Sequence, residues 1–138
     1  MIGDWSGTPA SPFNGRTVAF VSNRDGNLEI YVAAVDGTGE RRVTNDPGED
    51  VDPAFAPDGR RIVFTSDRSG AKEVWTVLAD GTGLTQVTHD GQGYDVPVWA
   101  PDGSRIAFAS SRSGDGDVWS MAPDGTDLQD LTNSPLFR

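Results

Sequence analysis

One pattern repeats three times along the chain and leaves few folds open. Its landmark positions lie 44 residues apart, as in Phe20, Phe64 and Phe108. Further triplets keep this spacing without insertion or deletion: Ser22, Ser66 and Ser110; Arg24, Arg68 and Arg112; Asp36, Asp80 and Asp124; Thr44, Thr88 and Thr132. A repeat of this length indicates that one supersecondary unit packs against copies of itself.

Each copy has the pattern of four short strands joined by tight turns. In the second copy we expect strands at residues 54–56, 61–66, 73–77 and 86–88. The segments Pro57-Asp58-Gly59 and Asp80-Gly81 are typical turn sequences, because proline presets φ and glycine accepts a positive φ. No segment shows the 3.6-residue apolar period of a helix. The sequence therefore predicts an all-β fold.

Two strands of the second copy carry apolar side chains on both faces, at Ile62-Val63-Phe64 and at Val74, Trp75 and Val77. A sheet with one face in water would alternate between apolar and polar residues. Each sheet should therefore lie between neighbours, as the four-stranded antiparallel blades of a β-propeller do. A three-sheet stack or a β-sandwich is the alternative, and the repeat length favours the propeller.

The repeat also divides the chain into three blades and their linkers. We expect an inter-blade linker at 1–8, blade 1 at 9–44, a linker at 45–52, blade 2 at 53–88, a linker at 89–96, blade 3 at 97–132, and a linker or tail at 133–138.

A family resemblance follows from the third copy. Residues 97–108 read PVWAPDGSRIAF, and SRSG at 111–114, DVW at 117–119, DGT at 124–126 and LT at 131–132 follow. This pattern resembles the TolB-type propeller repeat, also called the WD40-like or PD40 repeat, over about residues 9 to 132. The first copy departs from it at Ser11, where the others have Phe55 and Trp99.

The resemblance implies a propeller, typically six-bladed, that docks proteins in the bacterial periplasm. Related propellers gate the active sites of prolyl-oligopeptidase-like and tricorn-like proteases, whose catalytic residues lie outside the blades. It therefore implies a periplasmic location, although the N-terminus has no secretion signal and the location stays unknown. No apolar run approaches the roughly 20 residues that span a membrane.

Three blades alone would leave two apolar end faces, since propeller rings have about four to eight blades. We expect a homodimer that closes a six-bladed ring. Apolar Trp5, Leu136 and Phe137 occupy the end linkers and are the candidate junction between protomers. Frayed termini, or a fragment of a longer propeller, natural or engineered, are the alternatives.

One rim of such a ring would carry the linkers and the loops that hold the repeated arginines. The candidate rim or channel residues are Asp52, Asp95, Tyr94, Arg24, Arg68 and Arg112. In the alternative interpretation each arginine pairs with a nearby aspartate and braces its loop, and the recurrence in every blade favours this one.

The chemistry-bearing residues predict no catalytic or metal site. The single histidine, His89, provides neither a zinc cluster nor a catalytic triad, and cysteine is absent. The acidic run Asp46, Glu49, Asp50 and Asp52, or the pair Asp115 and Asp117, could bind Ca²⁺, although solvated acidic loops are commoner. We expect no cofactor.

Charge narrows the range of partners. The net charge of −10 argues against nucleic acid. The sequence favours a non-catalytic scaffold that binds itself and a protein or peptide. The alternative is an enzyme, or an anion- or carbohydrate-binding propeller, whose site forms only at the rim of the assembled ring.

Overall fold

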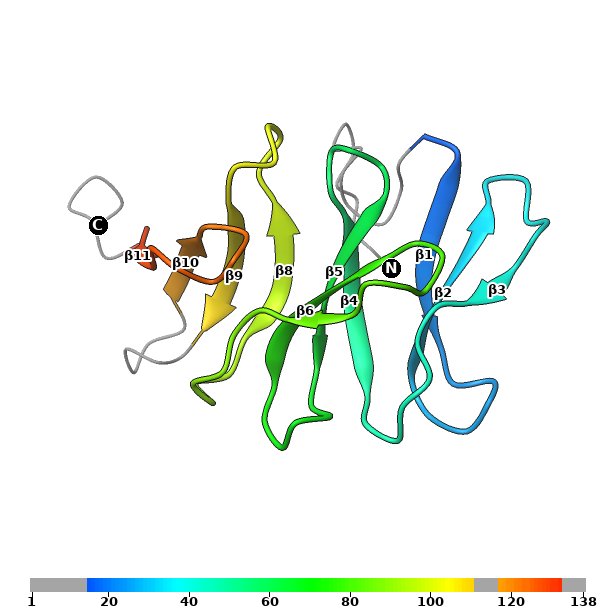
Figure 1. Cartoon of the computed structure of the whole chain (residues 1–138), viewed down its shortest axis with the longest axis horizontal. Helices are drawn as coiled ribbons and strands as arrows, with labels where there is room; N and C mark the ends of the chain where they lie inside the picture. The colour runs from blue at the N-terminus through cyan, green and yellow to red at the C-terminus, as the bar shows by residue number, and fades with distance from the viewer. Residues whose placement is uncertain (1–14, 111–116, 133–138) are drawn as a thin grey trace.

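Three antiparallel sheets lie side by side along the chain's long axis in the computed structural model, which describes residues 15–110 and 117–132 (Figure 1). The described residues form eleven strands and no helix, so they contain no helix that could span a membrane. The all-β prediction is confirmed.

Each sheet is a meander in which consecutive strands pair, and we refer to the three sheets as blades 1, 2 and 3. Blade 1 contains β1 (Thr17–Ser22), β2 (Glu29–Ala34) and β3 (Arg41–Arg42). Blade 2 contains β4 (Asp50–Phe55), β5 (Arg61–Ser66), β6 (Glu73–Leu78) and β7 (Thr85–Gln86). Blade 3 contains β8 (Asp95–Trp99), β9 (Ile106–Ser110), β10 (Asp117–Met121) and β11 (Gln129–Asp130). The first of the four strands expected for blade 1, around Ser11, lies outside the described residues.

The first strands of blades 2 and 3 begin earlier than the sequence predicts, at Asp50 and Asp95, within the stretches expected to be linkers. Both continue through a shift in pairing register, where Asp52 (φ 56°) and Val96 (φ 48°) occupy the same repeat position. An inserted residue of this kind bends a strand without ending it. The proline that follows has no N–H for the ladder, so the sequence alone suggests a strand start there.

Apolar layers fill the space between neighbouring blades, and we call each layer a seam. Blade 2 contributes to both seams, because Ile62, Val63 and Phe64 alternate between its faces and are all fully buried. The seam between blades 1 and 2 contains Ala19, Ile30, Val32, Val43, Phe55, Ile62, Phe64 and Val77. The seam between blades 2 and 3 contains Ala54, Ala56, Val63, Val74, Val87, Tyr94, Trp99, Ile106, Phe108 and Met121. This two-sided burial is the arrangement of propeller blades.

Candidate functional site

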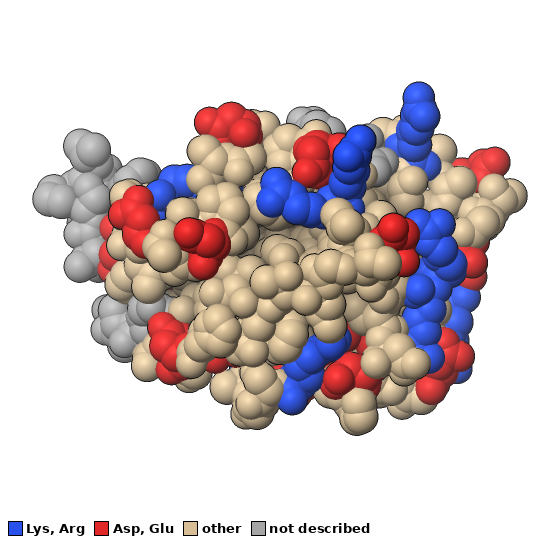
Figure 2. Space-filling model, in the orientation of Figure 1, with Lys and Arg blue, Asp and Glu red and all other residues tan. Residues whose placement is uncertain are grey.

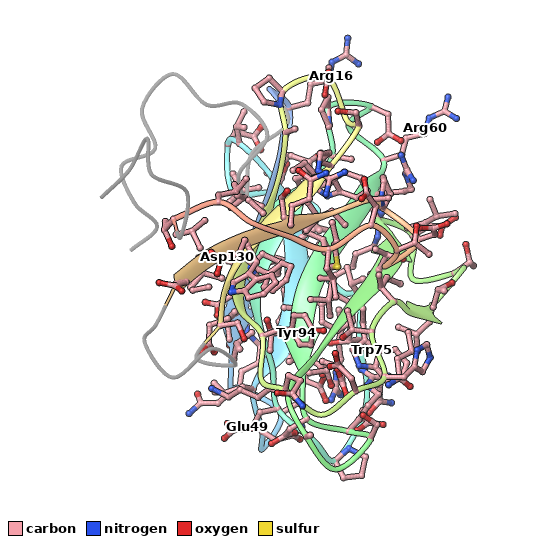
Figure 3. All side chains as sticks on the ribbon, turned by 90° about the vertical axis from the view of Figure 1, so that its left-hand side faces the viewer. Arg16, Glu49, Arg60, Trp75, Tyr94 and Asp130 are labelled. Atoms are coloured by element: carbon pink, nitrogen blue, oxygen red, sulfur yellow. The ribbon has the colours of Figure 1, made fainter. Side chains whose placement is uncertain are left out.

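One edge of the three blades gathers the loops that follow β1 and β5 and the segments that connect consecutive blades. We define this rim as residues 23–28, 43–49, 67–72 and 87–95; it forms the lower edge of Figure 1. Figure 3 shows Glu49 at this edge, whereas Arg16 and Arg60 project from the opposite one. Acidic and basic side chains are interspersed along both edges of the face in Figure 2.

The repeated arginines Arg24 and Arg68 brace their rim loops in the same way. In each, the backbone N–H and Nε donate to the serine hydroxyl two residues earlier, at 3.2 and 3.1 Å. Each guanidinium then lies over an aromatic ring, 4.8 Å from the centre of Tyr31 for Arg24 and 4.9 Å from the Trp75 ring for Arg68. Cation–π stacking of this kind holds a side chain in one direction. Arg112 lies outside the described residues.

The two arginines differ in their acidic partners. Arg68 is 10% exposed, and its Nη2 donates to Asp50 Oδ2 at 2.6 Å, with Asp46 at 3.9 Å. Arg24 is 45% exposed and pairs with Glu40. Arg68 therefore neutralises an acid inside the seam between blades 1 and 2, whereas Arg24 makes a surface contact.

A second buried acid, Glu29 of β2, lies beside Asp50 in this seam. Its carboxylate accepts hydrogen bonds from the Thr44 hydroxyl at 2.7 Å, the Asp46 N–H at 2.8 Å and Arg42 Nη2 at 3.1 Å. Neither Glu29 nor Asp50 has any solvent exposure. Blades 1 and 2 thus each bring one carboxyl group to a shared polar cluster above their apolar core.

The two carboxyl groups differ in proton affinity. Burial, with the hydrogen bond to Glu29, raises the pKa of Asp50 to about 6, although Arg68 and the Ser66 hydroxyl favour the charged form. Burial alone would raise the pKa of Glu29 as well, but hydrogen bonds from the Asp46 N–H and from side chains, including that of Asp50, hold it below its usual range. Asp50 is therefore the group that takes up a proton, and its O–H can then donate to Glu29.

The carboxylate and threonine recur in the next blade. Glu73 accepts the Thr88 hydroxyl at 2.6 Å and the Gly91 N–H at 2.8 Å. Sequence reasoning marked the threonines but missed their acidic partners, although Glu29, Glu73 and Asp117 share the 44-residue spacing and all three are buried. The period was the signal that could have found them.

The rim residue Tyr94 occupies the repeat position of Asp50. It is buried, and its hydroxyl donates to Asp90 at 2.9 Å (Tyr94 is labelled in Figure 3). Its ring lies 4.7 Å from that of Phe108. Tyr94 therefore supports the seam between blades 2 and 3, which has a phenol where the first seam has a second carboxyl group.

The remaining candidates do not converge on one point. Asp95 is exposed and pairs with Lys72 at 3.3 Å, while Asp52 is half-buried at the bulge of β4. The candidate junction residues Trp5, Leu136 and Phe137 lie outside the described residues.

Two of the acids that could bind Ca²⁺, Asp46 and Asp50, face the guanidinium of Arg68. Within residues 15–110 and 117–132, no three acidic or histidine side chains form a group that could hold a metal ion. Asp115, part of the alternative pair, falls outside those ranges.

Repeated antiparallel meanders of three or four described strands, with an apolar layer between neighbouring sheets, define a segment of a β-propeller. The chain belongs to the TolB β-propeller (PD40) family, whose sequence profile matches residues 3–136. A search of curated proteins finds no match.

Solved structures agree with this assignment. A putative TolB from Agrobacterium tumefaciens is 29% identical, with a TM-score of 0.79 over 88% of this chain and 47% of its own. TolB from Acinetobacter baumannii is 27% identical, with a TM-score of 0.76 over 91% of this chain and 32% of its own. A puromycin-hydrolysing peptidase from Mycobacterium tuberculosis, 21% identical at a TM-score of 0.67 over 91% of this chain and 22% of its own, shares the fold alone. The chain spans less than half of either TolB structure.

Proposed function

We propose that this chain is a non-catalytic scaffold that self-assembles into a closed propeller ring and binds a protein or peptide at its rim. The carrying observation is that the buried polar cluster beside the rim, in which Asp50 of blade 2 meets Glu29 of blade 1, joins two blades. Arg68 is paired with Asp50, and Glu29 accepts a hydrogen bond from Thr44, inside the seam between these blades, so the three groups are poorly placed to act on a substrate. The similarity to TolB structures supports a docking role.

The charge of the rim favours a basic partner. Its exposed acids among the described residues are Asp25, Glu49, Asp67, Asp90 and Asp95. Its exposed bases of fixed charge, Arg24 and Lys72, are already paired with Glu40 and Asp95. A surface with an excess of negative charge attracts a positively charged segment, and this attraction weakens as the salt concentration rises.

Binding is tested by fluorescence anisotropy with a labelled lysine-rich peptide that contains aromatic residues, and with its glutamate-substituted counterpart. We expect salt-sensitive binding of the basic peptide only. Glu49→Lys should weaken it several-fold, because Glu49 is exposed on the rim. The double variant Val35→Lys and Leu84→Lys adds the same charge at exposed positions outside the rim and should change binding little.

Equal loss in the two variants would assign the effect to net charge rather than to the rim, and equal binding of both peptides would contradict the proposal.

Self-assembly is tested by light scattering at micromolar concentration, with an expected mass twice the 14.7 kDa of one chain. A stable monomer would contradict that part.

A further inference from the structure

A close backbone contact marks each seam. The turn between β6 and β7 places Gly81 where an added Cβ would lie 3.3 Å from the carbonyl oxygen of Val43 in blade 1. The turn between β10 and β11 places Gly125 in the same relation to Val87 of blade 2, with a Cβ 3.3 Å from Val87 Cγ1 and still nearer the carbonyl oxygen. In both cases a turn glycine of the later blade covers the residue after the last strand of the earlier blade.

Blade 1 has the turn glycine without a preceding blade to contact, and blade 3 has the residue after the last strand without a following blade to cover it. Gly37 occupies the equivalent turn of blade 1 with the same backbone conformation, φ 87° against 89° for Gly81 and Gly125. None of the described heavy atoms lies within 4 Å of a Cβ built there. The equivalent of Val43 and Val87 in blade 3 is Leu131, which follows β11 and is half-buried.

Both end faces expose apolar side chains whose equivalents are buried inside the existing seams. Val18 and Phe20 of blade 1 are half-buried, whereas their equivalents Ile62 and Phe64 are completely covered inside a seam. At the other end, Val118 of β10 is 40% exposed, whereas its equivalent Val74 is fully covered.

Smaller residues of an earlier blade cover larger residues of a later blade in both existing seams. By repeat position, the free face of blade 3 has the smaller set, namely Ala107, Val118 and Leu131.

We infer that blade 3 of one copy packs on blade 1 of a second copy, with Gly37 of the second copy covering Leu131 of the first. This contact continues the two seams already present, and it rests on the ring closure proposed above. Because both halves lie on every chain, the contact is head-to-tail and occurs twice in a dimer. Two chains of three blades make six, a number at which propellers close.

Paired cysteines test this register, since the chain has none of its own. In the existing seam between blades 2 and 3, a Cβ at Gly103 would lie 3.8 Å from Cδ and 3.9 Å from Cγ of Pro57, a contact without a clash that leaves room for a disulfide. The equivalents of these residues on the end blades are Gly15 of blade 1 and Pro101 of blade 3. We expect the double variant Gly15→Cys and Pro101→Cys to oxidise at micromolar concentration into a covalent dimer, because in the proposed contact Gly15 of the second copy lies against Pro101 of the first. It should run as one band on a denaturing gel and return to monomer with reductant.

Two further variants serve as controls. Pro57→Cys with Gly103→Cys should form a disulfide within one chain, which verifies the geometry. Gly15→Cys with Leu84→Cys should stay uncrosslinked, because Leu84 is exposed on blade 2, which takes no part in the proposed contact.

Absence of the covalent dimer, while the control pair oxidises, would overturn the inference and indicate that other blades or solvent cover the end faces. A ladder of crosslinked oligomers would show end-to-end contact without closure and would overturn the ring. Peptide binding and light scattering on the unmodified chain separate this result from the wider proposal. A dimer that binds the basic peptide but does not crosslink would keep the scaffold and exclude this register.

Discussion

Arg68 donates to Asp50 across 2.6 Å inside the seam between blades 1 and 2, where the Asp50 side chain is fully buried. Glu29 lies beside Asp50. The pKa of Glu29 is lowered and that of Asp50 is raised, so Glu29 is the carboxyl group that stays negatively charged. A buried acid is costly unless it is paired and hydrogen-bonded. The polar cluster that joins blades 1 and 2 therefore contains a group, Asp50, with a pKa of about 6.

Asp50→Asn should change how stability depends on pH. The pKa of Asp50 rises from 3.8 unfolded to about 6 folded, so folding takes up a proton between these values. The native protein is favoured at low pH by this group and loses that advantage as pH rises through about 6. Asparagine removes the effect, so the stability of the variant relative to the parent should rise between pH 4 and 7, by at most about 3 kcal/mol.

Urea unfolding across this pH range measures the difference. Asp52→Asn, at the half-buried bulge of the same strand, is the matched control for loss of one carboxylate. Parallel stability profiles for the parent and Asp50→Asn would show that Asp50 does not take up the proton.

Thr44→Val should destabilise the first seam by about 1–3 kcal/mol. The Thr44 hydroxyl donates to Glu29 and accepts the N–H of Ile30 at 2.9 Å, so valine leaves both buried partners short of a hydrogen bond. Thr88→Val should cost a similar amount in the second seam, where Thr88 makes the same two contacts. Thr82→Val, at an exposed turn, is the comparison in chemical unfolding, and an equal loss there would refute a special role for the seam threonines.

Arg68→Lys should destabilise the protein more than Arg24→Lys. Lysine keeps the charge but loses the planar stacking and the Nε donor that both arginines use. The difference should be about 1 kcal/mol, because Arg68 is almost enclosed and Arg24 is nearly half exposed. Thermal unfolding of the two variants measures it, and equal melting temperatures would contradict it.

Gly37→Ala should shift the assembled protein toward monomer. Its Cβ would meet the backbone of the second copy as a Cβ at Gly125 would meet Val87. Gly26→Ala is the matched control, since Gly26 also has a positive φ and open space among the described residues. Sedimentation at several concentrations reports the dimer, and an unchanged dimer constant in Gly37→Ala would count against the proposed contact.

The sequence by itself determined the repeat, the turns, the all-β class and the propeller family. These features are local or periodic: a turn needs its own few residues, and a two-sided core shows in consecutive residues such as Ile62, Val63 and Phe64. The tertiary structure decided which polar groups meet. Glu29 and Asp50 belong to different blades, and the equivalent pair in the next seam is Glu73 with Tyr94.

Only packing of blade 2 on blade 1 brings the two carboxyl groups together and removes water from them. The early start of β4 likewise depended on pairing with β5, which continues on both sides of the bulge at Asp52. A periodic sequence predicts the blade because the contacts within a blade recur with the same period. The pKa of a buried carboxyl group such as Asp50 instead depends on the particular side chains that surround it in one seam.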